Sequence, residues 1–379
     1  MAVLLAAEEQ MMIEMVRDLA RERVAPRAAE IDASGEFPWD MKELLAKQDI
    51  LGMPFPEEYG GLGSSELSTL MVIEELAKAC ATTALILCVQ QLGALPILLA
   101  GTDEQKRRWI PKLATGEWLA AYGLTEPGSG SDAGAMATKA VRKGDTYVLN
   151  GVKHFITNAG IAHVNTIFAT TNPEAGTRGI SAFVVEDGTP GFRLGKVEHK
   201  MGIRGSQTGE LVFEDCEIPA GNLLGREGEG FKIALATLDR TRPGVAAQAL
   251  GIAQGALDFA TQYAKERVQF GKPIIANQAI QFMLADMDIK TEAARQLIYH
   301  VGEMMDSGST SFGRESAIAK TFASDAAIEV TNDAIQVLGG YGYMKEFPVE
   351  RMMRDAKITQ IYEGTNQIQR MVIARALAR

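Results

Sequence analysis

The chain has 379 residues, 46% of them hydrophobic, so it is long enough to form two or three domains with sizeable cores. Its formal net charge of −10 repels phosphate backbones, which argues against sequence-independent binding of nucleic acids. The three cysteines, Cys80, Cys88 and Cys216, have neither metal-ligand nor disulfide spacing, so we expect the buried, reduced thiols of a cytosolic protein.

Residues 1–119 predict an N-terminal helical domain, because Ala, Leu, Glu, Lys and Met dominate and apolar residues recur every three or four positions. Turn-forming residues interrupt this pattern at 35–38 and at 54–63. The zone contains no catalytic constellation of its own.

An uncharged stretch at 79–102 is long enough to cross a membrane. Gln90, Gln91, Gly93 and Pro96 lie near its middle, and polar groups are costly in lipid. We therefore predict a buried helix that ends near Pro96, and no membrane span. The start of the sequence lacks the basic region of a signal peptide, so we expect a cytoplasmic protein of bacterial type.

Residues 120–225 are rich in β-forming side chains and predict an antiparallel β domain. Asn150-Gly151 lies between the β-rich runs 147–149 and 154–157, which is a strong hairpin signal because both central residues need positive φ. Further strands are expected at 165–170, 180–185 and 210–213.

Residues 226–379 return to helical periodicity. Apolar and small side chains recur every three or four residues in two long segments, 280–305 and 318–337. This pattern predicts two long amphipathic helices that pack in a bundle.

Residues 128–133 read Gly-Ser-Gly-Ser-Asp-Ala and match the G-x-G-x-x-A dinucleotide pattern. No clear strand precedes them, no helical pattern follows, and no acidic residue stands about 20 positions on to hold a ribose, so we expect no Rossmann fold. Two interpretations remain open: a flexible surface loop, or a loop whose backbone N–H groups and hydroxyls face an anionic or polar cofactor.

The four histidines, His154, His163, His199 and His300, have no metal-ligand spacing, and no Cys-His pair suggests a nucleophile. Glu363 precedes a Gly-Thr turn that leads into the final helix. Its carboxylate could cap that helix, since anions are favoured at helix N-termini. It could instead act as a base if partial desolvation raised its pKa towards the working pH.

Three segments together resemble signatures of the acyl-CoA dehydrogenases: 122–132, 336–342 and 354–370. The third contains Tyr362-Glu363-Gly364-Thr365-Asn366 and is highly specific, and the order and spacing of the three agree with the family over essentially the whole chain. The resemblance implies an α+β fold in three domains. These are an N-terminal helical domain at 1–119, a central antiparallel β domain at 120–225 and a C-terminal four-helix bundle at 226–379.

The resemblance also implies a reaction. FAD accepts the β-hydride of an acyl-CoA while Glu363, as in the short-chain, medium-chain and glutaryl branches, removes the α-proton to give a trans-2-enoyl-CoA. The expected partners are the acyl-CoA substrate, electron-transfer flavoprotein and further copies of the chain in a homotetramer.

Contacts to FAD and substrate carry over from matching motifs. Thr157 is expected near the hydride-accepting N5 of the flavin, and the segment containing Arg267 is expected to reach the FAD of a neighbouring subunit. The expected FAD contacts are Tyr122, Leu124, Thr125, Gly130, Ser131, Phe155, Ile156, Thr157, Arg267, Gln269, Phe270, Gln336, Val337, Gly339, Gly340, Thr365 and Gln367. The expected substrate contacts are Ser131, Asp239, Arg242, Tyr362 and Gly364, and no metal is expected.

The sequence departs from the family pattern at three places. Phe155 stands where Trp is common, which leaves electron exit at that flavin edge open, and Gln269 replaces a common Thr. No Glu stands beside Arg242, where the isovaleryl and long-chain branches place their base.

The sequence favours a straight or short-branched acyl-CoA of short to medium length, because the uncharged stretch 79–102 offers no cation to a dicarboxylic tail. A specialised dicarboxylic or alicyclic acyl-CoA is the alternative. More distant alternatives are an acyl-CoA oxidase, a DNA-associated member of the fold and a flavoprotein that binds acyl-CoA without catalysis.

Overall fold

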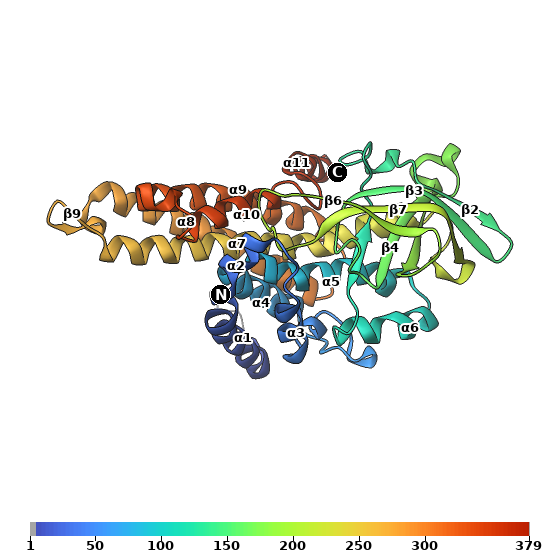
Figure 1. The fold of residues 1–379 in the computed structure, drawn as a ribbon, viewed down its shortest axis with the longest axis horizontal. Coiled ribbons are helices and arrows are strands. Elements are labelled where there is room, and N and C mark those ends of the chain that lie inside the picture. Colours follow the sequence, from blue (N-terminus) through green and yellow to red (C-terminus); the bar gives the residue numbers. More distant parts are fainter. Residues whose placement is uncertain (1–4, 379) are drawn as a thin grey trace.

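Helices, a central sheet and a second set of helices follow one another along the chain in the computed structural model, which describes residues 5–378. Figure 1 shows a long helical bundle that carries the sheet near one end, with the N-terminal helices packed along the bundle. The predicted domain limits remain a proposal. Helices give way to strands close to the first limit, where β1 begins at Ala120, and strands give way to helices close to the second, where α7 begins at Gly230.

The first zone is helical, as its periodicity predicts. Its α-helices are α1 (Ala7–Leu19), α2 (Ala28–Ser34), α3 (Trp39–Lys47), α4 (Glu66–Ala79), α5 (Ala81–Ala100) and α6 (Asp103–Ala114). Local capping fixes some of these ends. At the start of α6 the Thr102 side chain accepts a hydrogen bond from the backbone N–H of Gln105, whose own side chain accepts from the N–H of Thr102.

Helix α5 does not end at Pro96, and that prediction was wrong. The helix continues to Ala100 although proline cannot donate a backbone hydrogen bond. One turn before Pro96, the carbonyl of Gly93 accepts a hydrogen bond from the Thr166 hydroxyl at 2.8 Å. Most of the helix is also buried. Among the described helices α5 alone is long and apolar enough to cross a membrane, and 78% of its apolar window is packed inside the protein.

The central sheet is mostly antiparallel, with strand order β6-β7-β3-β2-β4-β5-β8. Its strands are β1 (Ala120–Gly123), β2 (Lys139–Lys143), β3 (Thr146–Thr157), β4 (Val164–Thr170), β5 (Ile180–Glu186), β6 (Phe192–Val197), β7 (Thr208–Pro219) and β8 (Leu223–Leu224). Strand β4 pairs in parallel with β1 and, at one position, with β2. Helix α5 lies close against β1, because a Cβ on Gly93 would come within 2.6 Å of that of Ala120.

The hairpin predicted at Asn150-Gly151 is also wrong, because β3 runs straight through these residues. The side chain of Asn150 instead exchanges hydrogen bonds with Asp215 on β7, at 2.8 and 3.1 Å, where the strand register shifts. A Cβ on Gly151 would lie 2.7 Å from Cα of Thr138, so close approach of two backbones explains the glycine. The turn between β2 and β3 lies at Gly144, which has φ 60°.

The third zone contains three long helices and two shorter ones. They are α7 (Gly230–Glu266), α8 (Gln278–Asp306), α9 (Gly313–Leu338), α10 (Val349–Thr359) and α11 (Asn366–Leu377). The strands β9 (Val268–Gln269) and β10 (Lys272–Pro273) form a small hairpin between α7 and α8, at the end of the bundle farthest from the sheet. The two predicted amphipathic helices correspond to α8 and α9.

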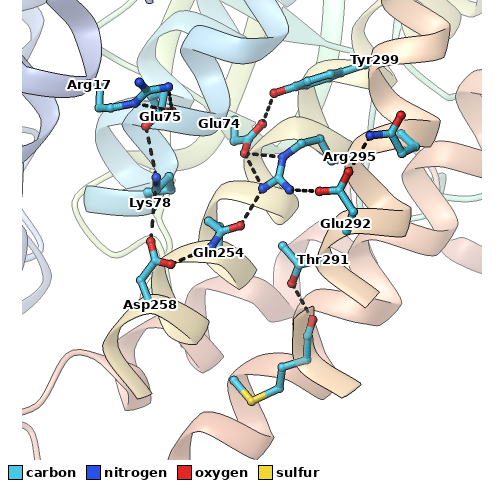
Figure 2. Close-up of polar contacts among 12 residues, drawn as sticks. Arg17, Glu74, Glu75, Lys78, Gln254, Asp258, Thr291, Glu292, Arg295 and Tyr299 are labelled. Atoms are coloured by element: carbon cyan, nitrogen blue, oxygen red, sulfur yellow. Dashed lines mark hydrogen bonds and ion pairs between the residues drawn. The ribbon is translucent and has the colours of Figure 1, made fainter. Parts of the chain in front are cut away.

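A buried polar network joins the first zone to the bundle (Figure 2). Glu74 of α4 accepts hydrogen bonds from Arg295 at 3.0 Å and from the Tyr299 hydroxyl at 2.8 Å, both on α8. Arg295 also donates to Gln254 of α7 at 2.6 Å. Burial and the Glu74 carboxylate raise the pKa of Tyr299, so the phenol stays protonated and continues to donate.

Candidate active site

Glu363 lies in the turn between α10 and α11 and not at the cap of α11. The capping interpretation was wrong, since Thr365 is the N-cap and its side chain accepts from the backbone N–H of Ile368 at 3.4 Å. Glu363 has φ 52° and Gly364 has φ 93°, so both residues are in the left-handed region. A non-glycine residue in this region costs about 1–2 kcal/mol, which the surrounding contacts must offset.

The carboxylate of Glu363 lies next to α7. The Thr241 hydroxyl donates to Oε2 of Glu363 at 2.6 Å. Burial raises the pKa of Glu363, while the Thr241 hydrogen bond and the positive charges of Arg242 and Lys320 counteract part of that rise. The result is a carboxylate that binds a proton more tightly than one in water.

Side chains from three helices hold the backbone of this turn. The carbonyl of Glu363 accepts from Arg242 Nε at 3.1 Å and from Gln369 Nε2 at 3.2 Å. The carbonyl of Gly364 accepts from Gln369 Nε2 and from Lys320 Nζ, each at 2.9 Å. Within residues 5–378 the backbone N–H of Glu363 has no acceptor, so it is available to a ligand.

Two phenols and a thiol also lie close to the carboxylate. Tyr122, Tyr362 and Cys88 are all close enough to Glu363 for its charge to add to the effect of burial, which raises the pKa of each. The hydroxyl of Tyr362 donates to Gln248, whose amide donates to the carbonyl of Ala81 at 2.8 Å. Desolvation of the carboxylate strengthens its electrostatic interactions with these neighbours.

A buried ion pair organises the loop that carries the glycine motif. Lys153 and Glu126 are both buried, and Lys153 Nζ donates to Glu126 Oε1 at 2.7 Å. Burial lowers the pKa of Lys153 to about 8, although the Glu126 charge opposes this. Glu126 also accepts from the backbone N–H groups of Ala137 and Thr138 at 2.5 and 3.0 Å, so the carboxylate ties together both ends of the loop.

The loop itself is open to solvent. Gly130 and Ser131 are exposed, and a Cβ on Gly128 or Gly130 would meet nothing within 4 Å. A three-residue turn at Ala133–Ala135 follows instead of a long helix, which confirms that the motif does not belong to a Rossmann fold. Exposed backbone and a free hydroxyl fit the interpretation in which this loop faces a polar cofactor.

A second group of expected FAD contacts lies at the far tip of the bundle (Figure 1). At this tip, residues of the β9–β10 hairpin and of the end of α9 line a cavity of about 530 Å³. Its lining includes Arg267, Gln269, Phe270, Val337, Gly339 and Gly340. Phe270 is 97% exposed, and Gly339 and Gly340 have open space where a Cβ would be. An arginine beside bare backbone suits a pyrophosphate group.

One chain therefore does not bring all the expected FAD contacts together. Tyr122, Leu124, Thr125, Phe155, Ile156 and Thr157 lie on or beside β1 and β3, at the sheet end of the molecule. Thr365 and Gln367 line a separate cavity of about 350 Å³ beside α11. Gln336 is exposed on α9 near the tip. A cofactor that met both ends would need a second copy of the chain.

The expected substrate contacts divide in a similar way. Tyr362, Gly364 and Arg242 adjoin Glu363, and Arg242 also pairs with Asp239 at 2.6 Å. Arg242 is buried, with 3% of its surface exposed, and already donates to the carbonyl of Glu363. Ser131 lies on the exposed loop that follows β1.

Phe155 projects from β3 with 61% of its surface exposed and φ 58°. Its ring packs edge-on against His154, with 3.9 Å between ring centroids. His154 also approaches Glu210 at 3.0 Å, a contact that fits a structural role. In the part of the chain that the structure describes, no group of three or more His, Cys, Asp or Glu residues could hold a metal. All three cysteines are buried and free.

Sequence reasoning missed Thr241, Lys320, Gln248 and Lys153. Thr241 stands beside Arg242 but carries no charge to attract notice. The sequence around Lys320 did contain a signal. Lys320 lies among small residues of α9 that recur every three or four positions and form a buried face. A lysine on such a face must find partners there.

The models of the acyl-CoA dehydrogenase family match the chain in three consecutive parts. The N-terminal domain model matches residues 6–117, the middle domain model residues 121–216 and the C-terminal domain model residues 228–378. The short-chain-specific acyl-CoA dehydrogenase of Clostridium acetobutylicum is 49% identical to the chain over 376 residues, covering 99% of each protein.

Solved structures agree over the full length of both chains. The structure of butyryl-CoA dehydrogenase from Megasphaera elsdenii is 49% identical, with a TM-score of 0.97. A chain in the structure "Electron transferring flavoprotein of Acidaminococcus fermentans: Towards a mechanism of flavin-based electron bifurcation" is 50% identical, with a TM-score of 0.98. These matches confirm the predicted family and fold, and the chain is thus a member of the acyl-CoA dehydrogenases, FAD-dependent oxidoreductases that act on acyl-CoA.

Proposed function

We propose that this enzyme dehydrogenates a saturated acyl-CoA of short to medium chain length and that Glu363 removes the α-proton. The observation that carries the proposal is the setting of Glu363, whose carboxylate is desolvated and accepts a hydrogen bond from Thr241. Its raised pKa makes it a stronger base than a carboxylate in water, which suits proton removal from a weak carbon acid.

The thioester α-carbon gives up its proton quickly only if the developing enolate oxygen is stabilised. The backbone N–H of Glu363 has no acceptor within residues 5–378 and lies in a turn held by Arg242, Gln369 and Lys320. We assign this N–H as one donor to the thioester oxygen. A donor fixed before the reaction needs no reorganisation when the charge appears.

Bound FAD supplies the acceptor for the β-hydride. We propose that the open loop at Gly130 and Ser131 and the hydroxyls of Thr125 and Thr157 hold the cofactor at the sheet end of one subunit. Arg267 would reach the same cofactor from the bundle tip of another. The expected contacts Gln269, Phe270, Gln336, Val337, Gly339 and Gly340 share that tip, and Thr365 and Gln367 lie beside α11.

The chain of hydrogen bonds from Tyr362 through Gln248 to Ala81 supports an upper limit on the length of the acyl group. We propose that the acyl tail runs towards this phenol and amide, which would then limit its length. Making room for a longer tail would break these hydrogen bonds. The short-chain-specific and butyryl-CoA dehydrogenases among the similar proteins support the same choice.

The electron acceptor that we propose is electron-transfer flavoprotein, because a chain 50% identical to this one belongs to a solved structure described by that name. A cytoplasmic location is proposed as well, since α5 packs within the core and the three cysteines are free thiols.

A panel of acyl-CoAs assayed with an artificial dye acceptor tests the substrate. We expect kcat/KM to rise with each methylene that contacts apolar surface, at about 0.8 kcal/mol each, and to fall where the pocket ends. Gln248→Ala should move that limit to longer chains. If glutaryl-CoA or an alicyclic acyl-CoA outperformed every substrate from butyryl to octanoyl, the assignment would be lost.

A further inference from the structure

Lys320 of α9 is a fully buried lysine that contacts the turn carrying Glu363. None of its surface is exposed, and Nζ donates to the carbonyl of Gly364 at 2.9 Å and to Oδ1 of Asn366 at 3.0 Å. Asn366 in turn donates to Ser324 and Asp325 of α9, at 2.9 and 2.7 Å. Lys320 thus connects α9 to Gly364 and Asn366, two residues that follow Glu363 in the chain.

The turn needs such support because of its backbone conformation. Glu363 has φ 52°, which is unfavourable for a residue with a Cβ, and a Cβ on Gly364 would lie 2.7 Å from Nε2 of Gln369. The peptide between Gly364 and Thr365 is held by two donors, Gln369 and Lys320. Without Lys320, one neutral amide would hold that carbonyl, and Oδ1 of Asn366 would lose the donor that ties it to Lys320.

The charge of Lys320 also acts on the base. Arg242 from α7 and Lys320 from α9 are the two cations that favour the charged form of Glu363. The acidic groups that face this pair are Asp239 beside Arg242 and Asp325 beside Asn366. Burial lowers the pKa of Lys320 to about 7, and the Glu363 carboxylate counteracts that shift, which is the mutual effect expected of close opposite charges.

We infer that Lys320 is a positioning residue for the reaction: by fixing the Gly364 peptide from α9, it keeps the carboxylate and the backbone N–H of Glu363 in the geometry that α-proton removal requires. The inference rests on the proposed role of Glu363 as the base. Lys320 would not touch the substrate, and it would act only through the turn.

The test uses the FAD-loaded enzyme with Lys320→Met, Lys320→Gln and, as a control, Lys290→Met, which removes a lysine that pairs with Glu329 on the outer side of α9. Flavin reduction by excess acyl-CoA is followed in a stopped-flow spectrometer. Misplacement of a catalytic group by about 1 Å can cost 10²-fold, so we expect a loss on the order of 10²-fold in the Lys320 variants. The control should reduce at the wild-type rate.

Two further readouts separate positioning from a general structural defect. Flavin content and the dissociation constant for acyl-CoA should stay at wild-type values, while the acid limb of the reduction rate should move to higher pH because one cation near Glu363 is gone. Lys320→Gln keeps a polar group without a buried charge, so the test does not depend on the folding of Lys320→Met. Wild-type reduction in either folded variant would overturn the inference, and so would loss of substrate affinity in step with rate. Failure of the base assignment would appear separately, as wild-type reduction in Glu363→Gln.

Discussion

The Thr241 hydroxyl and the backbone N–H of Glu363 serve two different parts of the same residue. Thr241 donates to the carboxylate, whereas the N–H, which has no acceptor in the described chain, is left for the thioester oxygen. The proposed base and the proposed oxyanion donor therefore belong to one turn. Any change that moves the turn would disturb both at once.

Replacing the base tests its assignment directly. Glu363→Gln keeps the size and the acceptor for Thr241 but cannot take a proton, so flavin reduction should fall by at least about 10²–10⁴-fold, the usual cost of losing a general base. Flavin content and acyl-CoA binding should remain. Stopped-flow reduction at a near wild-type rate would remove Glu363 from the mechanism.

The hydrogen bond from Thr241 predicts a pH effect. Burial raises the pKa of Glu363 and the Thr241 hydroxyl opposes the rise by stabilising the carboxylate, so Thr241→Val should raise that pKa further. The base is active when deprotonated, and its activity is lost as pH falls through the pKa. The acid limb of kcat should therefore shift to higher pH in Thr241→Val, with wild-type rates well above the limb. An unmoved or downward-shifted limb would contradict this.

At the scale of elements, β3 and the loop after β1 are joined by the pair of Lys153 and Glu126. Both side chains are buried, and the carboxylate also holds two backbone N–H groups at the far side of the loop. A buried pair of this kind adds little net stability compared with apolar side chains, but removing one member leaves an uncompensated charge.

Single and double variants separate these effects. Lys153→Met should lower the free energy of unfolding by about 3–5 kcal/mol and weaken FAD binding, because the loop that carries Gly130 and Ser131 loses its anchor. Adding Glu126→Gln should recover much of the lost stability, since no charge is then left buried. Denaturant unfolding and flavin titration measure the two quantities. A single variant as stable as wild type would show that the pair does not hold the loop.

At the scale of the whole molecule, the expected FAD contacts lie at opposite ends of an elongated chain (Figure 1). The hairpin β9–β10 exposes Phe270, and Arg267 packs over the ring of Tyr341 at 5.3 Å, close to the open backbone of Gly339 and Gly340. The cofactor site that we propose therefore needs a second subunit, which supports the proposal that the enzyme is an oligomer.

Arg267→Ala should therefore release FAD and weaken assembly together, because charge-assisted hydrogen bonds to a pyrophosphate would be lost at the subunit boundary. Arg23→Ala, at an exposed arginine of the N-terminal helices, is the matched control and should change neither property. Sedimentation velocity and the flavin-to-protein ratio measure the outcome. A monomeric wild type with full flavin occupancy would defeat the intersubunit proposal.

Much of the architecture was determined by the sequence itself. Periodicity of three and four set out α8 and α9, and β-rich runs located β4, β5 and β7, because side-chain spacing on one buried face is a local property. The segment around Glu363 identified the family and the expected base, since a specific motif depends on neighbouring residues along the chain.

Tertiary structure decided the features that depend on distant neighbours. Asn150-Gly151 became a bulge because Thr138 and Asp215 lie against it, and α5 passed Pro96 because burial outweighs one missing hydrogen bond. Likewise, the surroundings of Glu363 come from α7, α9 and α11, which are far apart in sequence. Desolvation and hydrogen bonding act through space, so the pKa of the base and the partners of its turn could be read only after the chain had folded.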